Sequence, residues 1–318
     1  MNNIYLNIYR PNLTNLKKAK KNIENNNVVG LPTETVYGLA ANAYSDKSVK
    51  KIFKLKKRPK YNPLIVHYSN LKDLKKDVII NKYFLKLYRT LCPGPITFIL
   101  NKKLKSNISK FVYAKKNTLA VRIPKHKVAR NLLKILNKPL AAPSANVSSK
   151  LSPTSAYDVF DEFNNKIKII LDGGQCKIGL ESTIIDLTDK PTILRQGAIS
   201  AKEIQKILKE KIFIKKNSKK IKSPGQLKFH YYPGIPVFIN KVKSKKNGAF
   251  VTFGTKYKYK KNYFNLSQKG NLNEAANNLY KTMRKIKNQN FTSISVCKIP
   301  NIDIGQAINE RLKKASYK

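Results

Sequence analysis

Arginine is scarce among the basic residues of this chain, and three of its arginines stand where they could bind an anion. Of 65 Lys and Arg residues only eight are arginine, and Arg58, Arg122 and Arg195 each end an apolar segment close to a proline or glycine. A guanidinium offers a planar fork of donors that grips a phosphate or carboxylate in two places, whereas lysine is a point charge. Because ligands of α/β folds bind at the ends of strands, these arginines predict an anion site there.

The stretch KKRPKYNPLIVH, residues 56–67, allows two interpretations. Lys56 and Arg58 fall at the expected C-terminus of a helix, where cations are favourable in any protein. Two prolines stiffen the following loop and Asn62 adds a neutral donor, which favours a grip on phosphate instead. His67 ends the next strand; a lone histidine is more often structural, and the sequence places no metal-ligand cluster around it.

Hydroxyl, phenol and amide side chains gather in four further stretches. These are 31–43 (Thr33, Glu34, Thr35, Tyr37), 118–124 (Thr118), 142–154 (Ser144, Asn146, Ser148, Ser149, Ser152) and 171–187 (Ser182, Thr183). Each is also compatible with an ordinary polar loop whose hydrogen bonds are satisfied. Taken together, cations, hydroxyls and amides suit phosphoryl or nucleotidyl transfer, where positioning and charge stabilisation supply most of the catalysis.

Several familiar catalytic motifs are missing from the sequence. There is no GxxxxGK[ST] loop, no strand-to-helix GxGxxG and no HExxH. Cys92, Cys176 and Cys297 lie far apart without a CxxC pair, so neither a disulfide framework nor a zinc knuckle is indicated. The pattern also suits acid–base hydrolysis poorly, because no carboxylate pair or Ser/His/Asp spacing stands out.

The strongest compositional signal is a formal net charge of +48 over 318 residues. Such a charge would normally suggest a nucleic-acid binder. Lysine, asparagine and isoleucine are all abundant, however, so lysine scattered over solvated helix faces explains the charge without a specific role. In either case we expect salt-sensitive, non-specific contact with RNA. No apolar run is long enough to span a bilayer and no signal-peptide pattern opens the chain, which predicts a cytoplasmic protein with no membrane partner.

Strand and helix patterns alternate with strong turn signals, which predicts an α/β fold with a mixed, twisted sheet. Leu16, Ala19 and Ile23 share one face of a helix over 12–26, and Asp46 can cap the next helix. Ser152 or Thr154 lies near the cap of a later one. The remaining segments are strands in 28–32, 63–67, 96–100, 118–124, 139–146, 167–174, 182–187 and 192–197, with helices in 81–91 and 127–137.

The residue composition of the sequence changes near residue 199. A helix over 201–210 leads into a Lys-, Ser-, Pro- and Gly-rich stretch that has the composition of a linker. Strands in 236–240, 249–254 and 293–297 follow, with helices near 273–287 and in 304–315. We therefore expect a catalytic domain over 8–200, a linker or lid over 212–235 and a small α/β domain over 236–318.

Ten short motifs, taken in order, resemble those of the YrdC-type threonylcarbamoyl-AMP synthases. They are PTETVYGL, K-x-R, NPLIVH, PGPITFIL, TLAVRIP, APSAN, SPT, LDGG, ESTIIDL and LR-x-G, and they cover about residues 10–198. The HYYPG stretch and the GQAINERLKKA ending resemble the long form of the family. The resemblance implies a YrdC-type twisted sheet around a basic cavity, joined to a small Rossmann-like C-terminal domain.

The resemblance also implies the site residues. The threonine pocket would consist of Thr35, His67, Arg122, Ala142 and Ser182, and the ATP site of Lys56, Arg58, Asn62, Thr118, Ser144, Asn146, Ser152, Arg195 and Tyr231. Arg122 would bind the substrate carboxylate, and Tyr231 would close over the nucleotide as part of a lid. Two departures matter: Lys57 stands where the family often has glycine, and Tyr232 competes with Tyr231 for the lid role.

The implied reaction joins L-threonine, bicarbonate and ATP into threonylcarbamoyl-AMP and diphosphate, the first step of threonylcarbamoyladenosine formation in tRNA. Mg²⁺ would be held by the ATP phosphates, with no tightly bound organic cofactor. The product would pass to a separate tRNA threonylcarbamoyl transferase machinery. Two alternatives remain: a non-enzymatic RNA-binding protein, favoured by the charge, and a carbamoyl-transfer enzyme, disfavoured by the lack of CxxC motifs.

Overall fold

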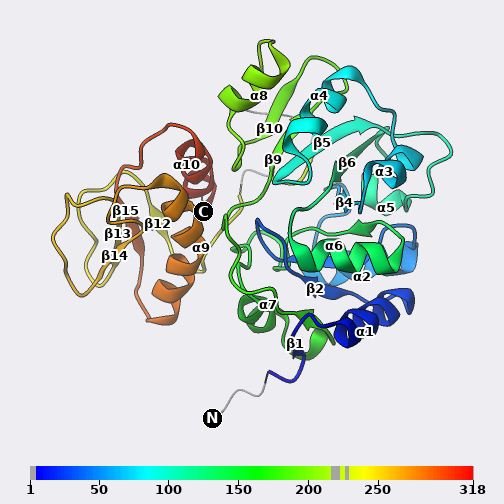
Figure 1. The fold of residues 1–318 in the computed structure, drawn as a ribbon. Coiled ribbons are helices and arrows are strands. Elements are labelled where there is room, and N and C mark those ends of the chain that lie inside the picture. The colour runs from blue at the N-terminus through cyan, green and yellow to red at the C-terminus, as the bar shows by residue number, and fades with distance from the viewer. Residues whose placement is uncertain (1–4, 216–222, 226–228, 318) are drawn as a thin grey trace.

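The structure is a computed structural model that describes residues 5–215, 223–225 and 229–317. Its larger part is a mixed sheet with strand order β1-β8-β2-β3-β7-β4-β6-β5-β9-β10-β11 (Figure 1). The strands are β1 (Ile8–Tyr9), β2 (Val29–Leu31), β3 (Gly38–Asn42), β4 (Ile65–His67), β5 (Ile96–Asn101), β6 (Thr118–Arg122), β7 (Leu140–Ala141), β8 (Ile170–Leu171), β9 (Thr183–Asp186), β10 (Thr192–Arg195) and β11 (Phe213–Ile214). Because the sheet contains both parallel and antiparallel pairs, the predicted mixed α/β class is confirmed.

Helices cover this sheet. They are α1 (Leu13–Glu24), α2 (Asp46–Lys56), α3 (Leu71–Asp77), α4 (Lys82–Leu91), α5 (Lys110–Tyr113), α6 (Lys127–Leu136), α7 (Ala156–Phe163) and α8 (Ala201–Leu208), with the 3₁₀ turn η1 (Asn164–Lys166). The three residues predicted to share a face of α1, Leu16, Ala19 and Ile23, are all buried. Periodic apolar spacing was therefore sufficient to place this helix.

The predicted cap Asp46 is wrong by one residue, whereas the prediction that Ser152 or Thr154 lies near the cap of a later helix is confirmed. The N-cap of α2 is Ser45, whose side chain accepts a hydrogen bond from the Ser48 backbone, while Asp46 lies in the first turn. The N-cap of α7 is Ser155, which forms a capping box with Asp158. Neighbouring residues of capping type compete for this role, and the one whose oxygen reaches the N3 amide wins.

Strand β3 was not predicted from the sequence. Its residues follow the polar turn over 32–37 and pair antiparallel with β2 on one side and β7 on the other. Its residues are small and mostly apolar and do not alternate between apolar and polar, because the strand is buried on both faces. The turn is thus held between two strands of the sheet, which fixes the polar side chains it carries.

The register of β4 and β6 decides where the candidate residues lie. The two strands are parallel, and His67 pairs with Arg122 at their carboxyl ends. Thr118 begins β6 and pairs with Asn101 of the antiparallel β5, at the opposite end of the strand from Arg122. The sheet therefore brings His67 and Arg122 together and separates Thr118 from them.

A second, smaller sheet forms the C-terminal unit of the chain. Its strands β12 (Val237–Phe238), β13 (Ala249–Thr252), β14 (Tyr263–Asn265) and β15 (Ile294–Val296) are parallel in the order β12-β15-β13-β14. Its helices α9 (Leu272–Asn288) and α10 (Ile304–Ala315) lie on the side of the small sheet that faces the large one (Figure 1). The predicted small α/β unit is present; β14 was not predicted.

The two parts share one apolar core. The side chains that pack α9, α10 and the small sheet together also contact Val36, Leu151, Leu180 and Tyr231 from the preceding chain. Within the predicted linker 212–235, residues 216–222 and 226–228 lie outside the described residues, and the predicted domain boundaries remain predictions. The described part of that segment contacts both the large sheet and the C-terminal unit.

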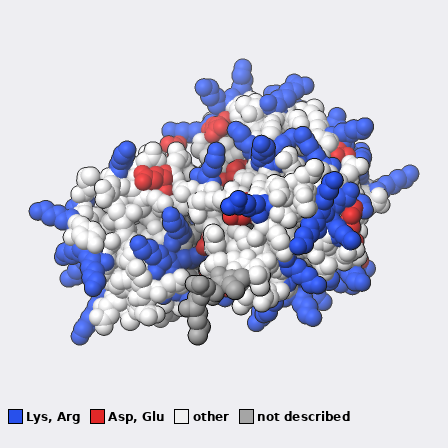
Figure 2. All heavy atoms as spheres, turned by 60° about the horizontal axis from the view of Figure 1, so that its bottom comes forward, with Lys and Arg blue, Asp and Glu red and all other residues white. Residues whose placement is uncertain are grey.

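Lysine and arginine side chains are distributed over both parts of the molecule. Figure 2 shows them around the whole visible face, with only a few acidic groups between them. On this face the charge is spread rather than gathered in one patch. Within the described residues, no helix is both long and apolar enough to cross a membrane.

Candidate active site

A cavity lies between the central strands of the large sheet and the described part of the 223–231 segment. Nine of the predicted site residues line it: Thr35, Arg58, His67, Arg122, Ala142, Ser144, Ser182, Arg195 and Tyr231. The segment contributes Pro224, Gly225 and His230 as well. Residues predicted from seven separate stretches therefore line one cavity.

Arg122 forms one wall of the cavity and is held rigidly. Its Nη2 donates to Glu34 Oε1 at 2.7 Å, its Nη1 to Thr35 Oγ1 at 2.9 Å and its Nε to the Gly94 carbonyl at 3.2 Å. Although burial alone would raise the pKa of Glu34, the charge and hydrogen bond of Arg122 and nearby backbone amides hold it below its usual range. Arg122 keeps two N–H groups beyond these three contacts for a ligand.

His67 lies beside Arg122 and is neutral. Burial and the Arg122 charge lower the pKa of His67 to about 3. Its Nδ1 is buried and has no hydrogen-bond partner among the described residues. A buried imidazole with an unused nitrogen suits a polar ligand, since an unpaired buried group is costly otherwise.

Arg58 and Arg195 add two further positive charges to the lining of the cavity. Arg58 donates to Asn62 Oδ1 at 2.7 Å and to the Pro63 carbonyl at 2.8 Å, while Arg195 donates to the Ser182 carbonyl and hydroxyl, both at 3.0 Å. Burial and the Arg195 charge lower the pKa of Arg58 to about 9. Within the described chain neither arginine has a carboxylate within ion-pair distance, so both favour an anion between them.

Two small backbone features support these arginines. Lys57 caps α2 in the left-handed conformation, with φ 48°, which explains why glycine suits this position. A Cβ on Gly197 would lie 2.4 Å from the Thr183 amide nitrogen, so this glycine allows the chain after Arg195 to pass close to 181–183.

Five predicted site residues do not line the cavity. Lys56 is buried behind it, with Nζ donating to the carbonyls of Ser144 and Asn146 at 2.5 Å each. Asn62 and Ser152 act as partners, of Arg58 and Glu181 respectively. The Asn146 amide closes its own loop, and Thr118 lies at the far end of β6. Here Lys56 shapes the 144–146 loop, and its predicted contact with phosphate stays a prediction.

Sequence reasoning missed three residues that the structure places at the site. Glu181 lines the cavity, His230 lies beside Tyr231, and Arg311 pairs with Glu181 from α10. Arg311 carried a usable signal, because it is one of the few arginines in a lysine-rich chain. Of the two candidate lid residues, Tyr231 lines the cavity and Tyr232 pairs with the Ser149 backbone instead.

These features define a class of site. Arg58 and Arg195, which have no carboxylate of the described residues within ion-pair distance, line one cavity with a neutral imidazole and several hydroxyls, and both cavity histidines have a pKa lowered to about 3. The arrangement suits the binding of a strongly anionic ligand next to a small polar one, with catalysis by positioning and charge stabilisation. A transferase that uses a nucleotide requires a site of this kind.

The chain belongs to the Sua5–YciO–YrdC family. Residues 21–197 match the model of that family, which is described as telomere recombination. Residues 199–316 match the model described as the C-terminal domain of threonylcarbamoyl-AMP synthase. The family predicted from the motifs, including its long form, is confirmed.

Curated relatives match nearly the whole chain. A threonylcarbamoyl-AMP synthase of Pyrococcus abyssi is 35% identical over 319 residues and covers 92% of both chains. That of Bacillus subtilis is 33% identical over 323 residues, covering 95% of this chain and 92% of the relative. A Schizosaccharomyces pombe synthase is 40% identical over 256 residues, covering 70% of this chain and 63% of its own.

Solved structures agree with the fold. The crystal structure of P. abyssi Sua5 complexed with L-threonine superposes with a TM-score of 0.88 at 33% identity, covering 97% of this chain and 96% of that one. Escherichia coli YciO gives 0.53 at 22% identity over 59% of this chain, which is a likeness of fold in the large sheet alone. The predicted YrdC-type sheet with a small C-terminal unit is confirmed.

Proposed function

We propose that this chain is a threonylcarbamoyl-AMP synthase, which converts L-threonine, bicarbonate and ATP into threonylcarbamoyl-AMP and diphosphate. One observation carries the proposal: Arg58 and Arg195, with no carboxylate of the described residues within ion-pair distance, share a cavity with a neutral histidine and with Arg122, which is paired with Glu34. The relatives above carry this name over nearly the full length of the chain. The product would pass to a separate transferase that modifies tRNA.

Threonine would occupy the side of the cavity formed by Thr35, His67, Arg122 and Ser182. The free N–H groups of Arg122 suit a carboxylate, because the guanidinium is already oriented by Glu34. The neutral His67 suits the threonine hydroxyl. A buried partner for that hydroxyl rejects an amino acid without it, since the partner would then be left unpaired.

ATP would place its phosphates against Arg58 and Arg195. The Ser144 and Asn146 loop, held from behind by Lys56, would support the nucleotide. No cluster of three or more His, Cys, Asp or Glu side chains capable of holding a metal occurs among the described residues. Mg²⁺ would accordingly arrive with ATP, bound by phosphate oxygens and water, as is usual for this ion.

The chemistry would take two steps. The threonine amine attacks the carbon of CO₂ and releases a proton, or attacks bicarbonate with loss of water, and in either case forms a carbamate. A carbamate oxygen then attacks the α-phosphorus, the bond from the α-phosphorus to the oxygen that bridges to the β-phosphorus breaks, and diphosphate leaves. Arg58 and Arg195 would stabilise the charge that develops on the phosphates. His67 is a poor general base at neutral pH because its pKa is lowered to about 3, so its role would be to orient threonine.

A diphosphate-release assay tests the proposal. The purified full chain should release diphosphate from ATP only when threonine and bicarbonate are both present, and omission of either should reduce release to background. Serine and valine in place of threonine serve as controls for the hydroxyl and methyl groups. Release that is independent of threonine would overturn the proposal.

A second property follows from the charge. We propose that the spread lysines give weak, non-specific RNA contact that falls steeply with salt. The distribution over both parts of the molecule in Figure 2 supports contact without a defined groove. Filter binding of an unrelated RNA at 50 and 300 mM salt tests this; sequence-selective, salt-resistant binding would contradict it.

A further inference from the structure

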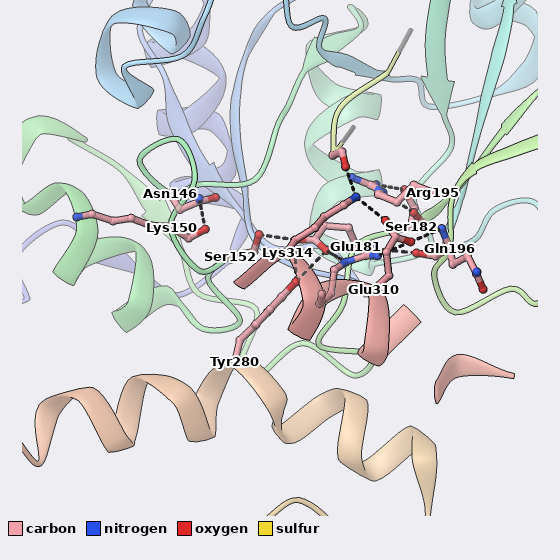
Figure 3. A network of polar contacts seen from close by, with 12 residues as sticks. Asn146, Lys150, Ser152, Glu181, Ser182, Arg195, Gln196, Tyr280, Glu310 and Lys314 are labelled. Atoms are coloured by element: carbon pink, nitrogen blue, oxygen red, sulfur yellow. Dashed lines mark hydrogen bonds and ion pairs between the residues drawn. The ribbon is translucent and has the colours of Figure 1, made fainter. Parts of the chain in front are cut away.

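Glu181 is a buried carboxylate at the edge of the cavity, next to the predicted threonine contact Ser182. It accepts hydrogen bonds from Ser152, from the Tyr280 hydroxyl at 3.2 Å and from Arg311 Nε at 3.1 Å. Figure 3 shows Tyr280 reaching from α9 towards Glu181, with Ser152 on one side and Ser182 and Arg195 on the other. The carboxylate therefore lies where both candidate substrate pockets meet the C-terminal unit.

Arg311 joins three parts of the site from a single position on α10. It pairs with Glu181, its Nη2 donates to the Gln196 carbonyl at 2.8 Å, and its guanidinium lies 5.3 Å from the centre of the Tyr231 ring. It is only 1% exposed. One guanidinium thus fixes the strand exit after Arg195, the carboxylate beside Ser182 and the proposed lid residue.

We propose that Arg311 is a positioning residue of the active site, supplied by the C-terminal unit. It holds the Glu181 carboxylate, and through it the backbone at Ser182, in the arrangement that binds threonine and ATP. This inference rests on the proposed function. It assigns to the C-terminal unit a direct role in assembling the active site.

Docking of the two parts does not require this ion pair. The shared apolar core already joins them, and a buried ion pair stabilises a fold little better than well-packed apolar side chains do. Arg284 of α9 provides a second contact between the parts, donating to the Leu151 carbonyl at 2.7 Å and lying 3.6 Å from Asp158. Arg284 does not line the cavity, which makes it a matched control.

The charge on Glu181 allows the proposal to be tested by the pH dependence of activity. A residue that only holds the two parts of the molecule together would not change this pH dependence. Although burial would raise the pKa of Glu181, Arg311, Arg195 and Ser152 lower it to about 2. The other groups that face it are His230 from the 223–231 segment, Lys56 from α2, and Tyr231 and Tyr280. Loss of Arg311 removes the largest of the favourable charges, so Glu181 would take up a proton at higher pH.

The test compares Arg311→Met, Arg311→Lys and Arg284→Met in the full chain by threonine-dependent diphosphate release from pH 5.5 to 8.5. We expect Arg311→Met to lower kcat/KM for threonine at least 30-fold and to move the acid limb of its pH profile upward. Arg311→Lys should recover part of the loss, because it keeps the charge but not the fork. Arg284→Met should stay within threefold of wild type with an unchanged profile.

A double variant guards against a folding defect. Glu181→Gln combined with Arg311→Met removes both charges of the pair, while Glu310, whose Oε2 lies 3.3 Å from Arg311 Nη1, keeps its contact with Lys314. The double variant should therefore fold like wild type, as judged by its urea midpoint, yet remain impaired in turnover. A wild-type kcat/KM in Arg311→Met or in the double variant would overturn this inference but not the proposed function. A loss of kcat/KM in Arg284→Met equal to that in Arg311→Met would do the same. A wild-type chain without threonine-dependent release would overturn the proposed function and this inference with it.

Discussion

Arg122 and Glu34 form a buried ion pair, with Nη2 and Oε1 2.7 Å apart, directly beside the pocket proposed for threonine. Because Thr35 and the Gly94 carbonyl take two more of its N–H groups, the guanidinium has little freedom to turn. The pair therefore sets the direction in which Arg122 offers its remaining donors.

Replacement of Glu34 tests this relationship. Glu34→Gln keeps the shape but leaves the buried Arg122 charge unpaired, so we expect a loss of about 3 kcal/mol in the free energy of unfolding. The KM for threonine should rise about tenfold, because Arg122 loses its orientation. Glu24→Gln, in the half-exposed pair with Lys20, is the control and should cost less than about 1 kcal/mol. Equal effects of the two changes would contradict the assignment.

Arg58 carries the main prediction for the phosphates. Arg58→Ala should abolish adenylate formation, lowering turnover by at least about 100-fold (~2.7 kcal/mol of transition-state stabilisation), with the fold intact by circular dichroism. Arg58→Lys keeps a charge without the fork and should recover only part of the rate. Near-normal turnover of Arg58→Ala would show that the phosphates bind elsewhere.

The proposed lid is tested by two neighbouring tyrosines. Tyr231 lines the cavity and stacks on Tyr280 with ring centres 5.8 Å apart, whereas Tyr232 pairs with the backbone at Ser149. Tyr231→Ala should lower kcat/KM for ATP about tenfold or more, while Tyr232→Ala should change it less than threefold. The reverse order of effects would assign the role to Tyr232.

Two buried histidines predict how stability depends on pH. Burial lowers the pKa of His67 and His230 to about 3, below the 6.5 of an exposed imidazole. Below pH 6.5 these histidines bind protons in the unfolded chain but stay neutral in the folded chain. Stability is therefore full above pH 6.5 and falls towards pH 3, by up to about 1.4 kcal/mol per pH unit for each histidine.

Urea unfolding between pH 7 and about 5.5 measures this slope above most of the range in which carboxylates titrate. His67→Gln should make the slope shallower, because it removes one contribution and leaves those of His230 and of His126, whose pKa burial also lowers. A slope that is unchanged in this variant would mean that His67 is already protonated or exposed in the folded chain.

Local patterns predicted most of the elements and much of the site. Apolar periodicity placed α1, and the rule that ligands bind at strand ends brought together Arg58, Arg122 and Arg195, which do share a cavity. Both inferences use information carried within about ten residues of the chain. Strand β3 was not predicted, because a strand that is buried on both faces shows no alternation of apolar and polar residues.

What the sequence did not predict depends on long-range pairing. Glu181 and Arg311 are 130 positions apart and meet only because α10 docks against the large sheet. Thr118 and Arg122 lie in one motif, yet the extended strand between them places them at opposite ends of β6. Lys56 lies beside Arg58 in sequence, but the end of α2 turns it away behind the 144–146 loop.

The most direct test is a crystal structure of the full chain with L-threonine and a non-hydrolysable ATP analogue. The account predicts threonine between Thr35, His67 and Arg122, with the triphosphate against Arg58 and Arg195 and the α-phosphorus facing the threonine amine. Electron density for the nucleotide outside this cavity, or threonine bound away from Arg122, would contradict it.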